Sequence, residues 1–459
     1  MAHRVLLTTL ARYQTVFWIP VGERLRALGL EPAFLTFDDP SDALIRAAGL
    51  KSFNAFDLGA AGSANPAAVE RELADVLGWT LPLAVSHERI TFGLRDTRML
   101  AGKLSMHRLA AGRALEALQS GGDRVTVVQE LGGFLSVIGT FLAARQSGIA
   151  NFFLEPSFFR GRFFATANSF AAPRPGAMAR DGAPEPEALR QLELARASRA
   201  IVIPAKDRHH YTMALRKVAN AANARRLLEK LYEKYGRRQR HEFGHLRSHV
   251  SAHLRMVANS SRLRRRYSEP PRGRPYVYYP LHVPADVALT LRSPQYLDQL
   301  ALVDFLARTL PASHLLAIKE HPAQVGALDA GRLRALLERY DNLVLLPPSK
   351  NNYDVLAGCD LVVSINSKAG AEALLVGKPV LVLGDAFYTE SGLVTRVRGL
   401  AELPGVIGQA LANPPAPAPA EVERFFSAVW KSTLPGELYS AQDNNAAVFA
   451  GSLAKALHG

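Results

Sequence analysis

Short apolar runs alternate with amphipathic stretches along much of the chain. Near the amino terminus, runs rich in β-branched and apolar residues predict strands at "RVLLTTL", "EPAFLTF", "RVTVVQE" and "NFFLEP". Helical periodicity is found in "VGERLRALG" and "FLSVIGTFLAARQSG". Because strands that alternate with helices favour parallel βαβ units, this region is predicted to form a doubly wound domain.

The same alternation resumes between Tyr276 and Gly384, and it is clearer there. Five nearly continuous apolar runs predict strands buried on both faces, at "YVYYPL", "HLLAIKE", "NLVLLP", "DLVVSI" and "PVLVLG". The stretches between them have helical periodicity, as in "GRLRALLERY" and "KAGAEALLVG". A second doubly wound domain is therefore predicted.

The segment between these two regions has a different character. It is rich in Arg, Lys, Leu, Ala and Tyr, which predicts two or three basic helices, and "SEPPRGRP" closes it. The fold class expected is α/β, with two Rossmann-like domains, a basic helical insertion and carboxyl-terminal helices. The predicted parts are a first Rossmann-like domain at 1–204, the insertion at 205–272, a second Rossmann-like domain at 273–412, and a proline-rich connector with helices at 413–459.

Composition is consistent with two cores of ordinary size. The chain has 459 residues, of which 48% are hydrophobic and 21% charged. The amino terminus has no signal-peptide pattern, and no apolar run reaches the length of a membrane span, so a cytoplasmic protein is expected. The single cysteine, Cys359, excludes an internal disulfide, and we expect it to be a small packed thiol.

The net charge of +14 is confined to residues 206–274. A basic face of this kind is often simply solvated, but it also suits anionic lipid, an acidic glycan or nucleic acid. Nucleic acid is the weaker alternative, because the aromatic residues of the segment are scattered rather than spaced for stacking. Within it, four histidines recur every four residues and would form a stripe on one helix, compatible with zinc but more typical of a polar face: His241, His245, His249 and His253.

Polar residues gather where the predicted strands of the second domain end. In a doubly wound domain, ligands bind at this edge of the sheet. The "HLLAIKEHPAQVG" run ends in Lys319, Glu320 and His321, and Pro322 stops the strand. Lys319 and His321 are expected to lie beyond the buried strand as cationic donors, and Glu320 to be structural. The other strand-end residues expected at this edge are His282, Asp286, Ser364, Asn366, Ser367 and Lys368. Glu372, in the helix that follows, is also predicted to bind the substrate.

The "SINSKAGAEA" stretch places hydroxyl and amide side chains directly before a helix. Such residues cap the free N–H groups of the helix, and the positive end of the helix dipole favours a phosphate. By itself, Asn366 or Ser367 is equally well explained as a simple N-cap. In the first domain, Gln129 and Glu130 end a strand before Gly132, and Glu130 is a candidate general acid or base. Glu155 ends the next strand and is a weaker candidate of the same type.

Three absences narrow the chemistry. No G-x-G-x-x-G follows the first strand, which disfavours dinucleotide binding, and no P-loop motif is present. No Asp-x-Asp occurs, so the usual carboxylate pair that holds a metal on a nucleotide diphosphate is missing. A donor with a single phosphate therefore fits better.

Four segments, taken in order, resemble a known family. "VVQELGG", "YYPLHVPAD", "IKEHPA" and "VSINSKAGAEALLVGKPVLVLGDAFY" are similar to the bacterial capsule polysaccharide biosynthesis family, and within it to the retaining β-Kdo transferases. The resemblance implies a GT-B-like architecture, with the first domain on the acceptor side and the second binding the nucleotide sugar. It also implies CMP-β-Kdo as the donor, with no cofactor and no metal.

The resemblance also implies roles for individual residues. Glu130 matches the acid/base region, His321 the contact with the CMP phosphate, and Asp286 the carboxylate nucleophile. Gln129 accompanies Glu130, and Ser364, Asn366 and Ser367 match the nucleotide-phosphate loop. The expected reaction is a double displacement that moves Kdo to a lipid-linked saccharide acceptor. The protein would then sit on the inner face of the cytoplasmic membrane, held to anionic lipid through residues 206–274.

Other functions remain open at this stage. The same scaffold would suit a transferase that uses CMP-sialic acid or a nucleotide-diphosphate sugar. A non-catalytic subunit of glycan assembly, or a nucleic-acid-binding protein acting through the basic segment, is the alternative of another class. Acceptor, linkage and oligomeric state are not determined by the sequence.

Overall fold

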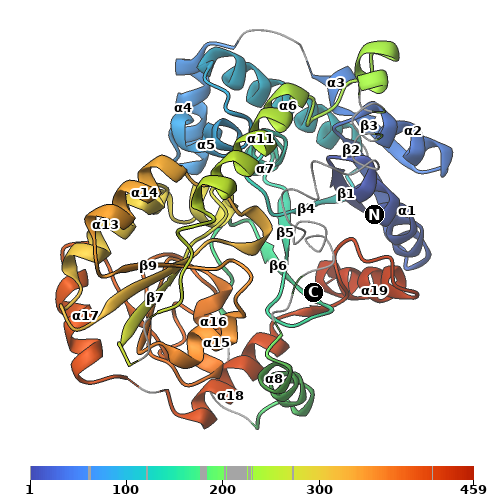
Figure 1. Ribbon diagram of the computed structural model, residues 1–459. Coiled ribbons are helices and arrows are strands. Elements are labelled where there is room, and N and C mark those ends of the chain that lie inside the picture. The colour runs from blue at the N-terminus through green and yellow to red at the C-terminus, as the bar shows by residue number, and fades with distance from the viewer. Residues whose placement is uncertain are drawn as a thin grey trace.

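The chain folds into two α/β domains, each built around one sheet (Figure 1). The computed structural model describes residues 2–59, 64–119, 122–175, 183–200, 203, 225, 229, 231–270, 273–415 and 417–458. Much of the predicted basic insertion, residues 204–224 above all, lies outside the described residues.

The first sheet has seven strands in the order β13-β6-β5-β4-β1-β2-β3. Strands β1 to β5 are parallel, whereas β6 and β13 are antiparallel to their neighbours. Their bounds are β1 His3–Thr9, β2 Glu31–Thr36, β3 Lys51–Asn54, β4 Arg124–Glu130, β5 Ala150–Pro156, β6 Arg162–Ala167 and β13 Leu434–Pro435.

Helices cover both faces of this sheet. Successive strand residues point to opposite faces, so Leu6 packs into one core and Leu7 into the other. One face is covered by α1, α2 and α19, and the other by α4 to α7. The helix bounds are α1 Arg12–Ala27, α2 Asp39–Ala47, α3 Ala55–Leu58, α4 Pro66–Leu77, α5 Leu81–Phe92, α6 Thr97–Gln119, α7 Leu135–Gln146 and α19 Asn445–His458.

The second sheet has six parallel strands in the order β12-β11-β10-β7-β8-β9. The order reverses at β7, which makes it a doubly wound sheet with its switch point beside β10. The bounds are β7 Tyr276–Pro280, β8 Leu315–Lys319, β9 Leu343–Leu346, β10 Leu361–Ser364, β11 Val380–Val382 and β12 Thr395–Arg396. The five predicted strands of this region are confirmed, and so is the α/β fold class with two Rossmann-like sheets.

Two helical layers enclose the second sheet. Helices α13, α14 and α17 pack on one face, whereas α8, α15, α16 and α18 pack on the other. Cys359 is buried in the second of these layers, as expected for a packed thiol. The bounds are α8 Pro186–Ser198, α12 Val287–Thr290, η4 Pro294–Tyr296, α13 Gln299–Thr309, η5 Pro322–Gln324, α14 Ala330–Arg339, α15 Asn352–Gly358, α16 Lys368–Leu375, α17 Leu403–Ala412 and α18 Pro419–Lys431.

Two segments pack on the domain that lies farther away in sequence. Helix α8 falls in the predicted first part, but Ala188 and Leu192 pack with Phe426 of α18 in the core of the second domain. In the opposite direction, the chain after α18 returns to the first domain, where β13 pairs with β6 and α19 lies against α1 (Figure 1). The carboxyl-terminal segment is thus part of the first domain's core.

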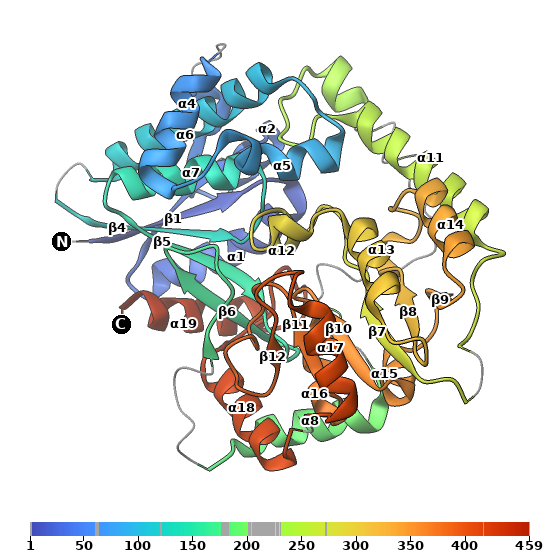
Figure 2. The same cartoon turned by 90° about the vertical axis from the view of Figure 1, so that its left-hand side faces the viewer.

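The described part of the basic segment contains η3 (Tyr232–Gly236) and α11 (Leu246–Leu263). Helix α11 runs along the outside from the α5 side to α14 and joins the two domains there (Figure 2). Because the helix begins at Leu246, His241 and His245 precede it, and the expected single-helix stripe of four histidines is wrong. Only His249 and His253 of the four lie on α11.

Candidate functional site

The carboxyl edge of the second sheet carries the densest group of predicted site residues. His282 follows β7, and its Nε2 accepts a hydrogen bond of 3.4 Å from the backbone N–H of Asn366, which follows β10. Burial lowers the pKa of His282 to about 4, and the ring interacts electrostatically with Asp286 and His321. The structure therefore brings these four residues together, from three strand ends, around a neutral imidazole.

His321 follows β8 and precedes the short helix η5, where Pro322 ends the strand as predicted. Its Nδ1 accepts a hydrogen bond of 3.3 Å from the backbone N–H of Ala323. In the neutral ring the proton must then be on Nε2, because only one ring nitrogen can act as the acceptor here. His321 consequently presents a donor on the side away from Ala323, which suits contact with an anion.

Asp286 begins the four-residue helix α12 as its N-cap. One oxygen, Oδ1, accepts a hydrogen bond of 2.9 Å from the backbone N–H of Ala288. The residue is exposed, unlike His282 beside it. Its carboxylate is thus held in place by the helix it caps while remaining accessible to a ligand.

The predicted phosphate loop lies between β10 and α16. Ser367 caps α16 by accepting the N–H of Ala369 at 3.2 Å, and Ser364 Oγ accepts the N–H of Ser367 at 3.0 Å. The hydroxyl of Tyr388 donates to the Ser367 carbonyl at 2.6 Å, and a Cβ on Gly370 would lie 2.3 Å from that hydroxyl. The serines thus fix the loop's backbone, which fits a helix cap and a phosphate cradle equally well.

Lys319 and Glu372, both predicted to bind the substrate, are buried side chains. Lys319 lies within β8 and is buried, and its Nζ donates to the Lys350 carbonyl at 3.0 Å. Glu372 is buried on α16 and accepts a hydrogen bond from the Asn352 amide, which in turn accepts one from Tyr278. Burial lowers the pKa of Lys319 to about 8 and raises that of Glu372 to about 7. The expectation that Lys319 extends beyond the buried strand is wrong, because its side chain packs into this cluster below the loop.

Glu320 and Lys368, also at this edge, both contact other parts of the protein. Glu320 is structural, as expected, since it accepts hydrogen bonds from the Tyr267 hydroxyl at 2.5 Å and from the N–H of Gly326 at 2.8 Å. Lys368 reaches across to the first domain, where its Nζ donates to the Ser157 carbonyl at 3.1 Å.

Strand β4 of the first domain separates its two predicted site residues. Gln129 is buried and donates hydrogen bonds to Asn151 Oδ1 and to the Val137 carbonyl, so it faces the core and not a substrate. Glu130 points the other way, and its Oε2 accepts hydrogen bonds from Gln14 at 3.0 Å and from Tyr439 at 2.8 Å. The two hydrogen bonds fix the position of the carboxylate at the end of β4.

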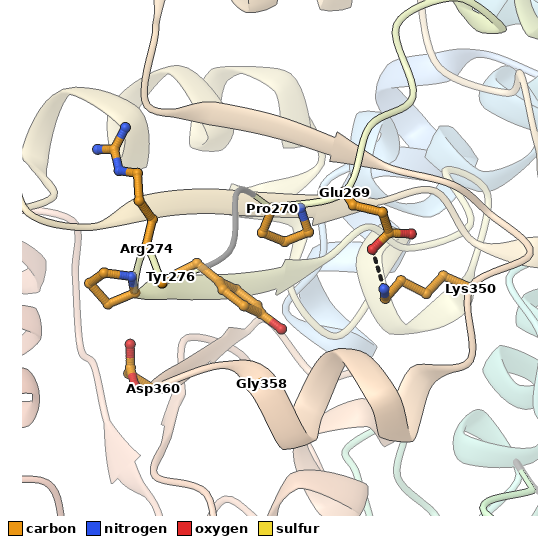
Figure 3. Close-up of a pocket in the computed structure, with 9 residues that line it drawn as sticks. Glu269, Pro270, Arg274, Tyr276, Lys350, Gly358 and Asp360 are labelled. Carbon is orange, nitrogen blue, oxygen red and sulfur yellow. Dashed lines mark hydrogen bonds and ion pairs between the residues drawn. The ribbon is translucent and has the colours of Figure 1, made fainter.

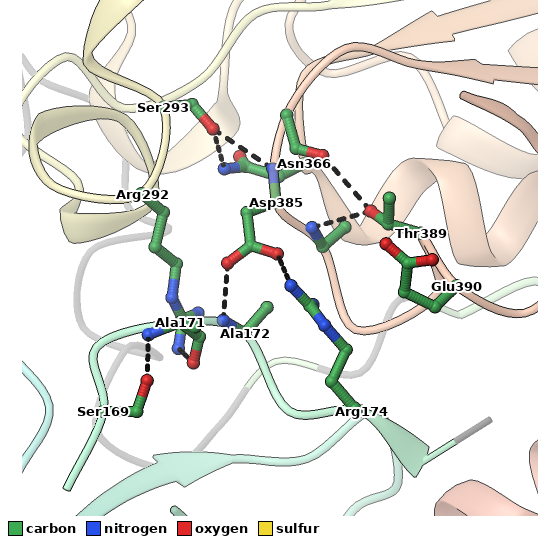
Figure 4. A network of polar contacts seen from close by, with 12 residues as sticks. Ser169, Ala171, Ala172, Arg174, Arg292, Ser293, Asn366, Asp385, Thr389 and Glu390 are labelled. Atoms are coloured by element: carbon green, nitrogen blue, oxygen red, sulfur yellow. Dashed lines mark hydrogen bonds and ion pairs between the residues drawn. The ribbon is translucent and has the colours of Figure 1, made fainter. Parts of the chain in front are cut away.

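A network of polar contacts joins the domains near Asp286 (Figure 4). Arg292 forms a two-pronged ion pair with Glu155, at 2.6 and 3.0 Å. Asp385, which follows β11, accepts a hydrogen bond from the N–H of Ala172 at 2.7 Å and pairs with Arg174. Glu155 is therefore an interdomain ion-pair partner instead of a free strand-end acid.

Two cavities lie elsewhere. One of about 480 Å³ is lined by residues around the start of β7, including the ion pair between Lys350 and Glu269 (Figure 3). The other, of about 770 Å³, lies between α6 and the turn before α11 and is lined by Phe56, Met99 and Arg98 among others. Neither is lined by Asp286, His282 or His321.

Several residues of this site escaped the sequence patterns. Asp385 directly follows strand β11, so the expectation that polar residues at strand ends form the site could have identified it. Arg292 and Tyr439 had no local signal, since their partners lie 137 and 309 residues away along the chain. His87, on α5, interacts electrostatically with Asp286. The sequence pattern around a histidine inside a helix does not predict such an interaction.

In the described ranges, no group of three or more His, Cys, Asp or Glu side chains is arranged to hold a metal ion. None of the helices in the described part of the chain combines the length and apolar character needed to cross a bilayer.

The family model for capsule polysaccharide biosynthesis proteins matches residues 138–403. The match takes in more than half of the chain and contains the whole polar edge of the second sheet. The protein therefore belongs to the capsule polysaccharide biosynthesis family, as the sequence motifs indicated.

Individual relatives are more distant. Protein FixF of Sinorhizobium fredii (strain NBRC 101917 / NGR234) is 30% identical over 130 residues, which are 28% of this chain and 31% of that protein. The chain thus matches less than a third of the length of this curated relative.

Among solved structures, the β-Kdo 2,7 transferase of Thermosulfurimonas dismutans KpsC is 17% identical, with 75% of this chain and 89% of that chain covered and a TM-score of 0.38. Acinetobacter baumannii MurG is 12% identical, with 99% and 100% covered and a TM-score of 0.32.

Proposed function

We propose that the protein is a retaining glycosyltransferase that moves Kdo from CMP-β-Kdo to a saccharide acceptor during the synthesis of a surface glycan. Membership of the capsule polysaccharide biosynthesis family supports the glycan pathway. The observation that carries the proposal is the meeting of Asp286, His282 and His321 beside the start of α16. The choice of Kdo rests on the motif resemblance around these residues.

In the first step, an oxygen of Asp286 attacks the anomeric carbon of the donor. The bond from that carbon to the phosphate oxygen breaks, and its electron pair leaves with CMP. The result is a glycosyl ester on Asp286. The departing phosphate gains negative charge, which the Nε2–H of His321 and the amino-terminal N–H groups of α16 would stabilise.

In the second step, an acceptor hydroxyl attacks the same carbon. The bond to Asp286 breaks, its electron pair returns to the carboxylate, and the hydroxyl proton passes to Glu130 as the general base. Two inversions keep the configuration of the donor. Gln14 and Tyr439 hold the Glu130 carboxylate in a fixed position through hydrogen bonds to its Oε2.

The test combines turnover with a matched pair of variants. Asp286 and Asp298 are both helix N-caps, but Asp298 caps α13 on the surface. We expect Asp286→Asn to lower the release of CMP from CMP-Kdo by about 10³-fold or more, and Asp298→Asn to change it less than about twofold. An adduct of one Kdo residue on Asp286 in the mass spectrum would support the first step. Unchanged turnover in both Asp286→Asn and Glu130→Gln would contradict the mechanism.

The same assay separates the alternatives. Turnover of CMP-sialic acid or a nucleotide-diphosphate sugar in preference to CMP-Kdo would change the donor but keep the class. No turnover with any nucleotide sugar and a suitable acceptor would favour a non-catalytic role in glycan assembly. We expect EDTA to leave activity unchanged, because the proposed chemistry uses no metal.

We also propose that the protein works on the inner face of the cytoplasmic membrane. On α11, Val250 and Leu254 are 40% and 55% exposed, and Arg247 and Arg255 flank them. An apolar stripe edged with arginines suits the surface of an anionic bilayer. The double variant Val250→Asp/Leu254→Asp should lose sedimentation with phosphatidylglycerol vesicles, while Leu28→Asp, at an exposed site on the first domain, should not. Equal binding of both variants would exclude α11 as the contact.

A further inference from the structure

The segment that carries Asp286, residues 286–293, is named here the Asp286 segment. By chain connectivity it belongs to the second domain. There the Asn366 amide donates to the Ala288 carbonyl at 2.6 Å and to Ser293 Oγ at 3.1 Å. Ser293 Oγ also accepts the N–H of Asp385 at 3.3 Å, and Leu289 packs in the core of the second domain. The segment contains only the single turn α12, and so short a helix has little stability of its own.

The first domain holds the middle of this segment through α5. Ser86 Oγ donates to the Thr290 carbonyl at 3.3 Å, and Nδ1 of His87 lies 3.4 Å from the Thr290 hydroxyl. Both His87 and Thr290 are buried. Figure 2 shows α12 between the first sheet and the rest of the second domain.

The ring of His87 is itself fixed from behind. It packs edge-on against Phe134 with centroids 4.6 Å apart. A Cβ on Gly133 would lie 2.5 Å from the ring, so glycine is needed for the close approach. The position of the His87 ring is therefore set by the loop that follows β4, where Gly133 lies three residues after Glu130.

The end of the segment is held by the first domain as well. Arg292 donates to both oxygens of Glu155, to the Phe170 carbonyl at 2.7 Å and to the Ala171 carbonyl at 3.1 Å. Figure 4 shows Arg292 reaching the segment that contains Ala171. The Arg292 side chain is only 8% exposed. A buried guanidinium with this many acceptors fixes the backbone on which it is mounted.

We propose that His87 and Arg292 are positioning residues that set the place of the Asp286 carboxylate, so that this carboxylate reaches its reactive position only when the first domain is docked. That this position is reactive rests on the proposed function, whereas the anchoring of the segment does not. Nucleotide binding, which uses the second sheet, and placement of the carboxylate, which uses the first domain, are then separable.

If nucleotide binding and placement of the carboxylate are separable, variants should show a specific kinetic pattern. His87→Leu should lower kcat by about 10- to 100-fold, as expected for a small displacement of a reacting group. The affinity for CMP should change less than about twofold, because His321 and the α16 loop are untouched. His87→Asn retains a donor near the Thr290 hydroxyl and should recover much of the loss. Arg292→Lys should behave like His87→Leu, because lysine cannot pair with both oxygens of Glu155.

The experiment measures three quantities on the full chain: kcat with CMP-Kdo, CMP affinity by calorimetry, and amide hydrogen exchange in the Asp286 segment. The control is His314→Asn, since His314 lies at the opposite, amino end of β8. The proposal expects faster exchange in residues 286–293 in His87→Leu and Arg292→Lys only, with lower kcat and normal CMP affinity.

Three results would overturn the proposal: unchanged exchange in the segment, faster exchange with normal kcat, or a loss of CMP affinity that parallels the loss of kcat. If the wild-type protein turns over no CMP-Kdo, the proposed function fails instead. The exchange measurement then decides the anchoring on its own, with Thr290→Val as a second way to remove the contact to His87.

Discussion

The two sheets present their carboxyl edges in different ways. At the second sheet, His282, Asn366 and His321 follow three adjacent strands, β7, β10 and β8, that lie within one stretch of the chain. At the first sheet, Glu130 is held by Gln14 from α1 and by Tyr439 from the far end of the chain. The polar edge of the second sheet is thus built locally, whereas the edge of the first sheet is completed by segments that are distant in sequence.

This difference implies a difference in robustness. Damage to the carboxyl-terminal segment should affect Glu130 while leaving the polar edge of the second sheet intact. Changes inside the second domain should affect the phosphate loop and leave the first domain intact. The predictions below test this separation.

The largest effect is expected for Phe449→Ala in α19. The Phe449 ring stacks on Phe163 at 4.3 Å and meets the Trp18 ring at 5.8 Å, and it is fully buried. Removing a buried phenyl ring costs about 3–5 kcal/mol of unfolding free energy. Urea unfolding should report this loss, whereas Val448→Ala, on the exposed side of the same helix, should stay within about 0.5 kcal/mol. Equal stabilities would mean that α19 is not part of the first core.

A second loss of unfolding free energy is expected for a change in the turn before α11, where this turn contacts the first domain. Glu242 is buried against Lys103 at 3.1 Å and His107 at 3.1 Å, while Lys103 also pairs with Glu88. Glu242→Gln should cost about 3 kcal/mol, the lower end for a broken buried pair, because Lys103 keeps one partner. Thermal or urea unfolding measures the change. Glu229→Gln, in an exposed pair with Arg225, is the control and should have almost no effect.

The third prediction concerns pH and the second domain. Burial raises the pKa of Glu372 from 4.5 to about 7. Between these values the folded state keeps a proton that the unfolded state has lost, so this residue makes the protein less stable as pH rises from 4.5 to 7. Glu372→Gln should remove about 2 kcal/mol of the change between pH 5 and pH 7.

Urea unfolding of the wild type and of Glu372→Gln at both pH values checks this effect. Comparing the two proteins cancels the opposite contribution of His87 and His282, whose lowered pKa values favour the folded state above pH 6.5. Glu390→Gln, in an exposed pair with Arg396, should keep the wild-type pH dependence. If the unfolding free energy of Glu372→Gln changed between pH 5 and pH 7 as much as that of the wild type, the Glu372 carboxyl would not be the source of the effect.

The smallest effect is expected for Tyr439→Phe. This change removes one of the two hydrogen bonds to Glu130 and leaves the one from Gln14. A lost hydrogen bond of about 1.4 kcal/mol corresponds to about a tenfold lower kcat, with unchanged CMP affinity. Tyr340→Phe removes a similar bond to Asp304 on the surface and should keep full activity. An effect on CMP affinity would contradict the separation of the two edges.

Much of the second domain was predictable because its information is local. Each of its five apolar runs is a strand, and a polar residue that ends a parallel strand must lie at the common edge. Lys319 shows the limit of this rule. The pattern marks where the strand ends, but only the packing of Asn352, Glu372 and Lys350 shows that its side chain turns inward.

The first domain was less predictable for the same physical reason. β4 and its Gln-Glu ending were evident, yet alternation alone did not say which of Gln129 and Glu130 faces the core. Contact with Asn151 decided it. Strand β13 has only two residues and pairs with β6, which lies far earlier in the chain, so no local periodicity marks it.

By itself, the sequence determined the α/β class, the strands that carry the motifs and the concentration of polar residues at their ends, since periodicity reflects local burial. Only the tertiary structure decided that α8 joins the second domain and α19 the first, that Tyr439 holds Glu130, and that His87 and Arg292 hold the segment of Asp286. These contacts depend on which surfaces meet when both sheets have formed. Residues hundreds of positions apart then become neighbours, with no local pattern to mark them.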